Sequence, residues 1–395
     1  MKHILVAPDS FKGSLSAYKV GEAVAKGVKA VFPSAGVEIL PMADGGEGTV
    51  EALLYANKGK VEEVEVSGPL MERVLAKYGV FDYDGKPHAV IECAESTGLT
   101  LVPIDKRNPM KSNSYGFGEQ IRDAIAKGYR HLVVTLGGSA TNDGGLGMLQ
   151  ALGWRFYDQA GRLLTPEDGN PLLHAYDFST EGVLPELSEC TITIASDVMN
   201  PFYGPQGAAF VFAGQKGASM EEIIELDGHL KRFADLVEKR LGVNIQAISG
   251  AGAAGGLGGA FAGCLGADMQ SGIEMVLHYA NAAEKMKHAD LVFTGEGSLD
   301  SQSIYGKVPV GVAKLARKYG IKVIGIAGRI DTDTKLLNEH IDAVFSIQTQ
   351  CRTLEEAMQP EVTERQIEVT VEQICRLMEE AENRPPAPLE SRQDH

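Results

Sequence analysis

The sequence lacks the local signatures of several common enzyme classes. Its 395 residues contain no GxxxxGK[ST] loop, no HExxH motif and no GxSxG motif. P-loop nucleotide hydrolases, zinc peptidases and serine hydrolases of the common types are therefore unsupported. The five cysteines include no CxxC pair, which also leaves zinc ribbons and thioredoxin-type redox sites without support. Scattered thiols are typical of a reducing compartment, so we expect a cytoplasmic protein.

Positive charge and long apolar runs are also in short supply. The chain has 37 Lys and Arg residues against 53 Asp and Glu residues, a formal net charge of −16. Nucleic acids and anionic membranes bind basic surfaces, so we expect neither as a partner. The uncharged stretch 241–267 is rich in glycine and alanine rather than in large apolar residues. It therefore indicates a buried loop and helix and not a membrane span.

Hydrophobic patterning predicts an α/β protein with one domain inserted into another. The first 60 residues alternate strand and helix, with strands at Ile4–Ala7 and Val37–Leu40 and helices at Ala17–Val31 and Thr49–Ala56. This alternation is typical of a parallel sheet, and it returns after residue 290. Residues 61–92 instead alternate apolar and polar side chains between turns, which predicts an antiparallel meander. Further expected elements are a strand at Thr191–Ala195 and an amphipathic helix at Met220–Leu241.

We therefore expect one α/β domain from residues 1–60 and 288–382. A mixed α/β domain is expected at 61–287, and a disordered Pro-rich tail at 383–395.

Glycine is the residue in excess: 46 glycines make up about 12% of the chain, against a usual level near 7%. In four loops they flank acidic residues that follow an expected strand. Ligands of open α/β sheets bind at the carboxyl ends of strands, and glycines let a backbone approach a phosphate. Carboxylates beside phosphates need a cation such as Mg²⁺ between them. Each loop alone is typical of a turn or helix cap, but the set of four favours function. The candidate metal ligands are Asp44, Glu47, Asp143, Glu296 and Asp300.

Three lysines and one further glycine cluster complete the candidates. Lys12, Lys216 and Lys307 each have glycine neighbours, which makes them candidates for contacts with phosphate or carboxylate groups. Residues 250–255 match GxGxxG, but no acidic residue follows at the end of a next strand. We therefore favour a packing or phosphate-loop role over dinucleotide binding.

Taken together, these segments resemble the type I glycerate kinases of bacteria. The matching stretches follow the family's order over nearly the whole chain: PDSFKGS at 8–14, ADGGEGT at 43–49, GGSATNDGG at 137–145, SDVMNP at 196–201, QKGA at 215–218, GAGAAGG at 250–256, TGEG at 294–297 and DSQ at 300–302. The resemblance implies ATP-dependent phosphorylation of D-glycerate, usually at the 2-hydroxyl, with Mg²⁺. It also implies a flavodoxin-like domain formed from both chain ends and an insert likened to restriction-endonuclease folds.

Phosphoryl transfer requires positioning, charge neutralisation and an acceptor for the hydroxyl proton. We expect Asp197 to accept that proton, and Lys12 or Lys216 to meet the glycerate carboxylate or the transferring phosphoryl group. The expected nucleotide contacts are Gly137, Gly138, Ser139, Gly252, Gly255, Gly256 and Lys307. Two alternatives remain open: a kinase for another small hydroxy acid, and a non-catalytic sensor of nucleotides or organic acids. The sequence also leaves open whether the chain forms a homo-oligomer.

Overall fold

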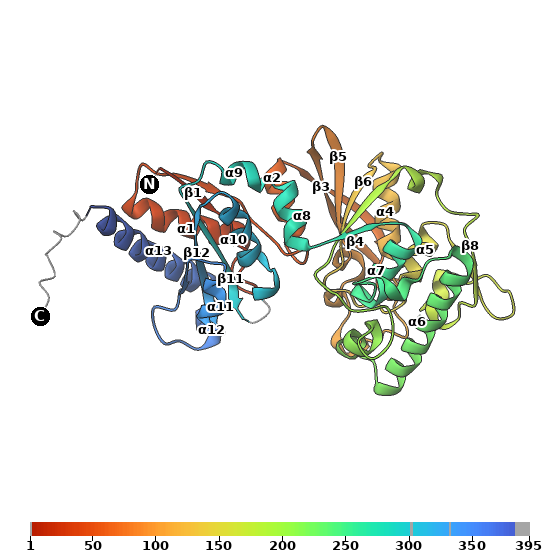
Figure 1. Ribbon diagram of the computed structural model, residues 1–395. Coiled ribbons are helices and arrows are strands. Elements are labelled where there is room, and N and C mark those ends of the chain that lie inside the picture. The colour runs from red at the N-terminus through yellow and green to blue at the C-terminus, as the bar shows by residue number, and fades with distance from the viewer. Residues whose placement is uncertain (1, 301–302, 332, 384–395) are drawn as a thin grey trace, which may run out of the picture. The chain divides into compact units, whose positions relative to one another are not determined.

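The computed structural model describes residues 2–300, 303–331 and 333–383. The chain divides into two compact units (Figure 1). The terminal unit is drawn from residues 1–41 and 283–395, and the inserted unit is Met42–Ala282. The expected tail, apart from Asn383 at the end of the last helix, lies outside the described residues, as do Ser301 and Gln302 of the DSQ segment.

The terminal unit contains a five-stranded sheet in which all neighbouring strands are parallel. Its order is β13-β12-β11-β1-β2. The bounds are β1 His3–Val6, β2 Gly36–Ile39, β11 Leu291–Leu299, β12 Lys322–Ile330 and β13 Ala343–Ser346. The two chain ends thus form one sheet, as the returning strand–helix alternation predicted. From β1 the chain proceeds outward to β2, whereas from β11 it proceeds outward in the other direction, so the order reverses between β1 and β11.

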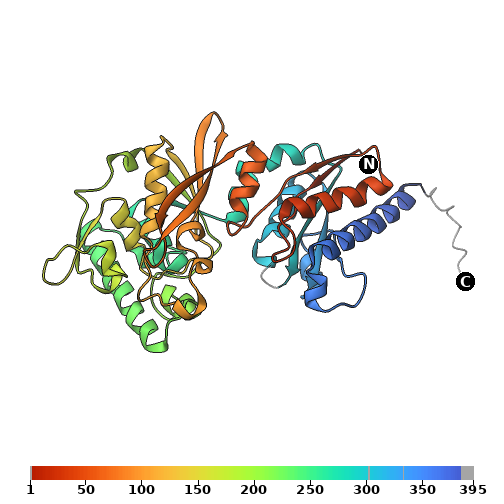
Figure 2. The same ribbon diagram turned by 180° about the vertical axis from the view of Figure 1, so that it is seen from behind.

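Helices cover both faces of this sheet (Figures 1 and 2). Helices α1 (Ala17–Val31) and α13 (Pro360–Asn383) lie side by side on one face, and α10 (Val308–Lys318) packs on β11 and β12. The core beneath α1 and α13 includes Ile4, Phe293 and Val371, all fully buried. Shorter helices are α9 Ala282–Met286, α11 Thr334–Asn338 and α12 Leu354–Ala357.

The inserted unit contains a six-stranded mixed sheet of order β10-β9-β6-β5-β4-β3. Strands β3 Lys60–Ser67, β4 Arg73–Tyr83 and β5 Lys86–Glu92 form the predicted antiparallel meander. Strands β6 His131–Thr135, β9 Thr191–Ala195 and β10 Asp268–Gln270 continue parallel to β5. Four parallel strands therefore end at the same edge of this sheet.

Helices and one two-stranded antiparallel sheet surround the mixed sheet. The helices are α2 Thr49–Asn57, α3 Ala94–Thr97, α4 Tyr115–Ala126, α5 Leu146–Ala151, α6 Met220–Leu241, α7 Ala253–Gly259 and α8 Gly272–Tyr279. The strands of the small sheet are β7 Arg155–Tyr157 and β8 Asp177–Ser179. Across the described residues, no helix has both the length and the apolar character required to cross a bilayer.

Helix α2 belongs to the inserted unit, although its sequence position suggested the terminal domain. It packs on β4, its Val50 N–H donates to a Glu92 carboxylate oxygen at 3.1 Å, and the Asn57 amide donates to the Tyr279 carbonyl at 3.0 Å. The alternation of strand and helix is therefore interrupted after β2. The first unit boundary in the structure lies at Pro41 and Met42, not near residue 60.

Two helical glycines allow a matched test of the packing of α1 on α13. A Cβ on Gly27 would lie 2.7 Å from the Glu368 carbonyl oxygen and 2.8 Å from Val371 Cβ, whereas a Cβ on Gly228 in α6 would meet nothing within 4 Å. We expect Gly228→Ala to stabilise the protein by about 1 kcal/mol, because alanine restricts the unfolded chain. Gly27→Ala should destabilise it, because α1 and α13 must separate. Thermal unfolding measures both, and an equal gain from both substitutions would contradict the tight helix contact.

Candidate active site

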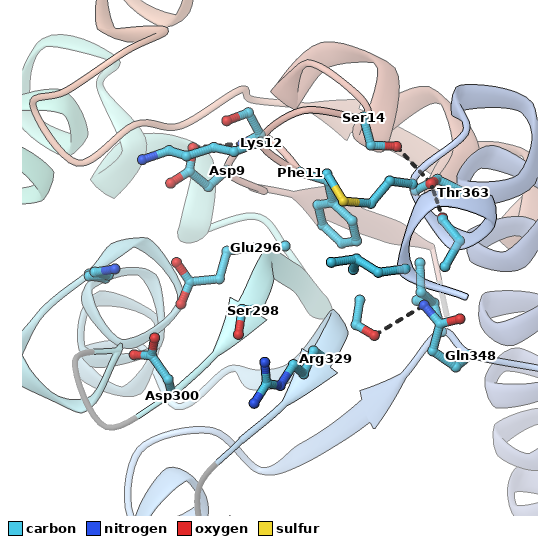
Figure 3. A pocket seen from close by; sticks show the side chains of 18 residues that line it. Asp9, Phe11, Lys12, Ser14, Glu296, Ser298, Asp300, Arg329, Gln348 and Thr363 are labelled. Carbon is cyan, nitrogen blue, oxygen red and sulfur yellow. Dashed lines mark hydrogen bonds between the residues drawn. The ribbon is translucent and has the colours of Figure 1, made fainter. Parts of the chain in front are cut away.

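A cavity of about 360 Å³ opens at the carboxyl ends of β1, β11, β12 and β13 in the terminal unit. It is lined by the loop after β1, by the second half of β11, by Lys307 at the start of α10, and by residues of α12 (Figure 3). This is the position where the strand order reverses. Open α/β sheets commonly bind ligands at such a reversal, because the two flanking loops diverge there and leave a crevice.

Three carboxylates lie at one end of this cavity (Figure 3). Glu296 and Asp300 are four residues apart along β11 and its end, so both side chains are on the same side of the strand. Ser303 joins them: its hydroxyl donates to Glu296, and its N–H donates to Asp300 Oδ1 at 3.2 Å. Asp9 lies in the loop after the neighbouring strand β1, where its N–H donates to the Gly295 carbonyl at 2.8 Å. The β1–β11 ladder thus brings two predicted metal ligands beside a third carboxylate.

Cationic side chains line the same cavity. Lys12 is exposed on the loop after β1, and Lys307 is the N-cap residue of α10. Arg329 on β12 is the register partner of Ser298 on β11, and it pairs with Asp331. Sequence reasoning did not identify Asp9 or Arg329 as site residues. Asp9 had a weak signal, because it lies in the PDSFKGS segment, whereas Arg329 had none.

A second group of predicted residues gathers at the strand ends of the inserted unit. The loop 137–145 follows β6 and is held by Lys216, whose ammonium donates to Ser139 Oγ at 3.0 Å and to the Thr141 carbonyl at 2.6 Å. Lys216 is 2% exposed, and this burial lowers the pKa of its ammonium to about 8. Gly137 and Gly138 remain exposed on the same loop. Their backbone is therefore accessible to a ligand, whereas the buried Lys216 ammonium holds the loop by two hydrogen bonds.

Asp143 has a buried, fully bonded environment. Its carboxylate accepts hydrogen bonds from Ser114 N at 2.7 Å, Ser114 Oγ at 2.8 Å, Gly145 N at 3.0 Å and Gly147 N at 3.2 Å. Burial raises the pKa of this carboxyl group, and the four donors oppose that rise. These contacts give Asp143 a role in shaping the loop and leave little room for a metal ion.

The glycines of the 250–256 segment are buried against neighbouring backbone. A Cβ on Gly252 would lie 2.3 Å from the Pro201 carbonyl oxygen, and one on Gly255 would lie 2.2 Å from the Thr141 carbonyl oxygen. On Gly256 it would lie 2.7 Å from Gly144 Cα. The close partners of these three glycines are therefore protein loops, which explains their presence without a phosphate.

Asp197 follows β9 and lies beside the loop that carries Asp44. Its Oδ1 accepts a hydrogen bond from Gly272 N at 3.0 Å. The residue is exposed, yet crowding by neighbouring atoms removes part of its water and raises the pKa of the carboxyl group, to which Asp44 also contributes. Gly45 and Gly272 permit this close approach, since a Cβ on Gly272 would lie 1.8 Å from the Asp44 carbonyl oxygen.

Glu92 lies at the same edge of the mixed sheet, at the end of β5, and was not predicted as a site residue. It ends β5, accepts the Val50 N–H at the start of α2, and has its carboxyl pKa raised to about 7 by burial, with contributions from Glu95 and Glu47. Glu47 itself is exposed. The signal in the sequence was only a glutamate at the end of an apolar strand, which many strands have.

The predicted metal ligands are divided between the two units. Glu296 and Asp300 belong to the terminal unit, and Asp44, Glu47 and Asp143 to the inserted unit. Within the described ranges, no three His, Cys, Asp or Glu side chains form a complete metal-binding group. Mg²⁺ does not need one, because it typically takes one or two carboxylates together with substrate phosphates. The donor set at the terminal-unit cavity suits that mode of binding.

Comparison with known proteins identifies the family. The model of the Glycerate kinase family matches residues 4–379. The chain belongs to the glycerate kinase family. It is 47% identical to a protein of Escherichia coli (strain K12) named glycerate 2-kinase, with 90% of this chain and 92% of that protein covered. It is 46% identical to a glycerate kinase of Bacillus subtilis (strain 168), with 90% and 93% covered.

A solved structure agrees with this assignment. A crystal structure of a protein from Salmonella typhimurium LT2 matches with a TM-score of 0.86 and 42% identity, covering 96% of this chain and 99% of that one. The family and the enzyme class that the ordered motifs predicted are thus confirmed, as is an α/β fold with a parallel sheet from both chain ends and a separate mixed sheet.

The raised pKa of Glu92 predicts a pH-dependent effect on stability. An unfolded glutamate loses its proton near pH 4.5, whereas folded Glu92 keeps its proton to about pH 7. The contribution of Glu92 to stability therefore falls as the pH rises between these values, by about 3 kcal/mol in all. Glu92→Gln should raise the melting temperature by several degrees at pH 8 and change it little at pH 4.5.

Glu119 provides the control for this measurement. Its carboxylate also accepts a backbone N–H, from Ser67 at 2.6 Å, but it lies beside Arg73. Glu119→Gln should not stabilise the protein at pH 8, because it removes an attractive charge pair. An equal loss of stability in both variants would contradict the assignment of a costly charge at Glu92.

Proposed function

We propose that this glycerate kinase transfers the terminal phosphoryl group of ATP to the 2-hydroxyl of D-glycerate, giving 2-phosphoglycerate, in the cytoplasm. The observation that carries the proposal is the cavity at the strand reversal of the terminal unit, where carboxylates and cations lie together in a member of a kinase family. Phosphoryl transfer needs both kinds of group, to hold a metal ion and to neutralise phosphate charge. The name of the Escherichia coli relative supports the 2-hydroxyl as the acceptor.

The two compact units support a proposal about the domains. The strand order of the terminal unit, counted along the unit, is 2-1-3-4-5, which is the order of flavodoxin-like folds. We propose that this unit is the family's flavodoxin-like domain and that the inserted unit is its restriction-endonuclease-like domain. Flavodoxin-like proteins bind their ligands where the strand order reverses. In this unit that place lies outside the carboxyl ends of β1 and β11.

We propose that Mg²⁺ is held by Glu296 and Asp300, with Asp9 beside them. All three line the same cavity, and Ser303 bonds to two of them. When bound, the ion neutralises phosphate charge and orients the terminal phosphoryl group. Lys12 lies on the neighbouring loop and would contact a phosphate oxygen. Asp44 and Glu47 remain candidates for a metal contact at the edge of the inserted unit. Asp143 is not a proposed metal ligand, because its carboxylate already accepts four hydrogen bonds.

We further propose that Asp197 accepts the proton of the attacking hydroxyl group. A carboxylate with a raised pKa is a better base than an ordinary one, and partial loss of water supplies that rise here. As the new oxygen–phosphorus bond forms, the bond between the terminal phosphorus of ATP and its bridging oxygen breaks and ADP leaves, while the hydroxyl proton moves to a carboxylate oxygen of Asp197. Lys216 would act as a positioning residue, because its buried ammonium bonds to the loop that presents Gly137 and Gly138.

The reaction is tested by identifying its product. Incubation with D-glycerate and Mg-ATP should give 2-phosphoglycerate, whose phosphorus signal is a doublet in proton-coupled NMR because one proton lies on the adjacent carbon. 3-Phosphoglycerate would give a triplet instead. EDTA should abolish the reaction and added Mg²⁺ should restore it, because uncompensated carboxylates would repel ATP. A triplet product would exclude the 2-hydroxyl, and full activity in EDTA would exclude the metal.

The role of Asp197 is tested by a pair of matched substitutions. Asp197→Asn keeps the shape but removes the base, so kcat should fall by about 10²–10⁴ with the KM for ATP nearly unchanged. Asp227 is a suitable control, because it also accepts one backbone N–H, from Gly204 at 2.7 Å, and burial also raises its carboxyl pKa. Asp227→Asn should leave kcat within about twofold. Similar kcat losses in both variants would indicate a structural effect.

A further inference from the structure

The cavity of the terminal unit has a second, apolar end. Phe11 is 3% exposed and Ile347 is 1% exposed, and both contribute to its lining. Leu354 and Met358 line it from α12 and the residue after it, and Leu354 is 74% exposed. Figure 3 shows Phe11 and Gln348 away from the group formed by Asp9, Glu296 and Asp300. The cavity therefore joins a charged end to a largely apolar one, where the apolar side chains lie beside the neutral polar residues Ser14, Gln348 and Thr363.

The apolar end is held in place by specific contacts from three segments. Ser14 Oγ and Thr363 Oγ1 lie 2.7 Å apart, and Thr363 Oγ1 also donates to the Ala357 carbonyl at 2.9 Å. A Cβ on Gly13 would lie 2.8 Å from Met358 Cε, so the loop after β1 lies against the end of α12. These contacts fix the wall of the cavity without a ligand, as expected for a largely pre-formed pocket.

We propose that this apolar end binds the adenine base of ATP. The inference rests on the proposed function, which requires a nucleotide, and adds where its base lies. Among the parts of the two substrates, the base alone presents broad apolar faces, whereas the phosphates, the metal ion and the three-carbon acid are charged or polar. A base that lies near Phe11 and covers Leu354 would remove the apolar surface of Leu354 from water, which favours binding.

The position of the charged end supports the same orientation. A nucleotide with its base among Phe11, Ile347 and Leu354 would direct its phosphates along the cavity toward the carboxylates and Lys12. The cavity volume of about 360 Å³ falls within the range of small-molecule sites, roughly 300–1,000 Å³. A three-carbon acid alone would leave the exposed side chain of Leu354 in contact with water.

The test compares two exposed leucines of the terminal unit. Leu354→Glu places a charge at the apolar end, and its site at the start of α12 tolerates an acidic residue. Leu377→Glu is the control, because Leu377 on α13 is 69% exposed and does not line the cavity. Binding is followed by displacement of N-methylanthraniloyl-ADP with adenosine or with tripolyphosphate. The KM values for ATP and D-glycerate are measured in parallel.

Leu354→Glu should weaken displacement by adenosine and raise the KM for ATP at least tenfold. Displacement by tripolyphosphate and the KM for D-glycerate should stay within about twofold, as should every value for Leu377→Glu. Lys12→Gln, at the charged end, should weaken displacement by tripolyphosphate and leave displacement by adenosine unchanged. Unchanged adenosine displacement in Leu354→Glu, or a rise in the KM for D-glycerate alone, would overturn the base pocket. If the wild-type protein forms no phosphoglycerate while adenosine still discriminates between the variants, the proposed function fails and the base pocket stands.

Discussion

The pairing of β1 with β11 is the constraint on which the terminal unit and its cavity depend. Ile4 to Val6 pair in parallel with Leu291 to Phe293, although 287 residues separate the paired positions. The ladder continues past the strand, where Thr294 Oγ1 donates to the Ala7 carbonyl at 2.8 Å. Because the chain proceeds in opposite directions from these two strands, their following loops diverge, and the cavity opens between them. One set of backbone hydrogen bonds thus both closes the sheet and places Asp9 beside Glu296.

Close packing of loops, rather than ligand binding, explains much of the glycine excess in the inserted unit. Gly45 and Gly272 let the loop carrying Asp44 lie directly on the start of α8, and Gly255 lets its segment lie on Thr141. A side chain at any of these positions would overlap backbone atoms, which cannot move aside as a flexible side chain can. The same residue type that suggested phosphate contacts therefore positions carboxylates and loops, and the exposed Gly137 and Gly138 remain for a ligand.

Elements with strong local signals could be predicted from the sequence almost to the residue. Helices Ala17–Val31 and Met220–Leu241 and strand Thr191–Ala195 have the predicted bounds. Both helices begin after a serine whose hydroxyl accepts a backbone N–H, and α6 also has a reciprocal glutamate. Such caps act within a few residues, so they are visible in a single sequence.

Features that depend on distant residues could not be predicted in this way. Helix α2 was expected with the terminal domain because it follows β2 in sequence, whereas its contacts with β4 and Glu92 decide its place. Arg329 reaches the cavity only because β12 pairs with β11 in a particular register. The high pKa of Glu92 likewise arises from burial and from acidic neighbours on other segments. Motif order could identify the family, but only the folded chain assigns these side chains to a site.

The loop 137–145 shows why buried charges accompany exposed glycines. Glycine-rich backbone is intrinsically flexible, and ordering it has an entropic cost that an apolar core cannot offset at a surface. Here the Lys216 ammonium donates hydrogen bonds to the middle of the loop. Near the end of the loop, the Asp143 carboxylate accepts hydrogen bonds from four donors. Burying each group is unfavourable, as the lowered pKa of Lys216 and the raised pKa of Asp143 indicate. In some proteins such buried groups specify one conformation. The conformation that Lys216 and Asp143 bond to here leaves the backbone of Gly137 and Gly138 exposed.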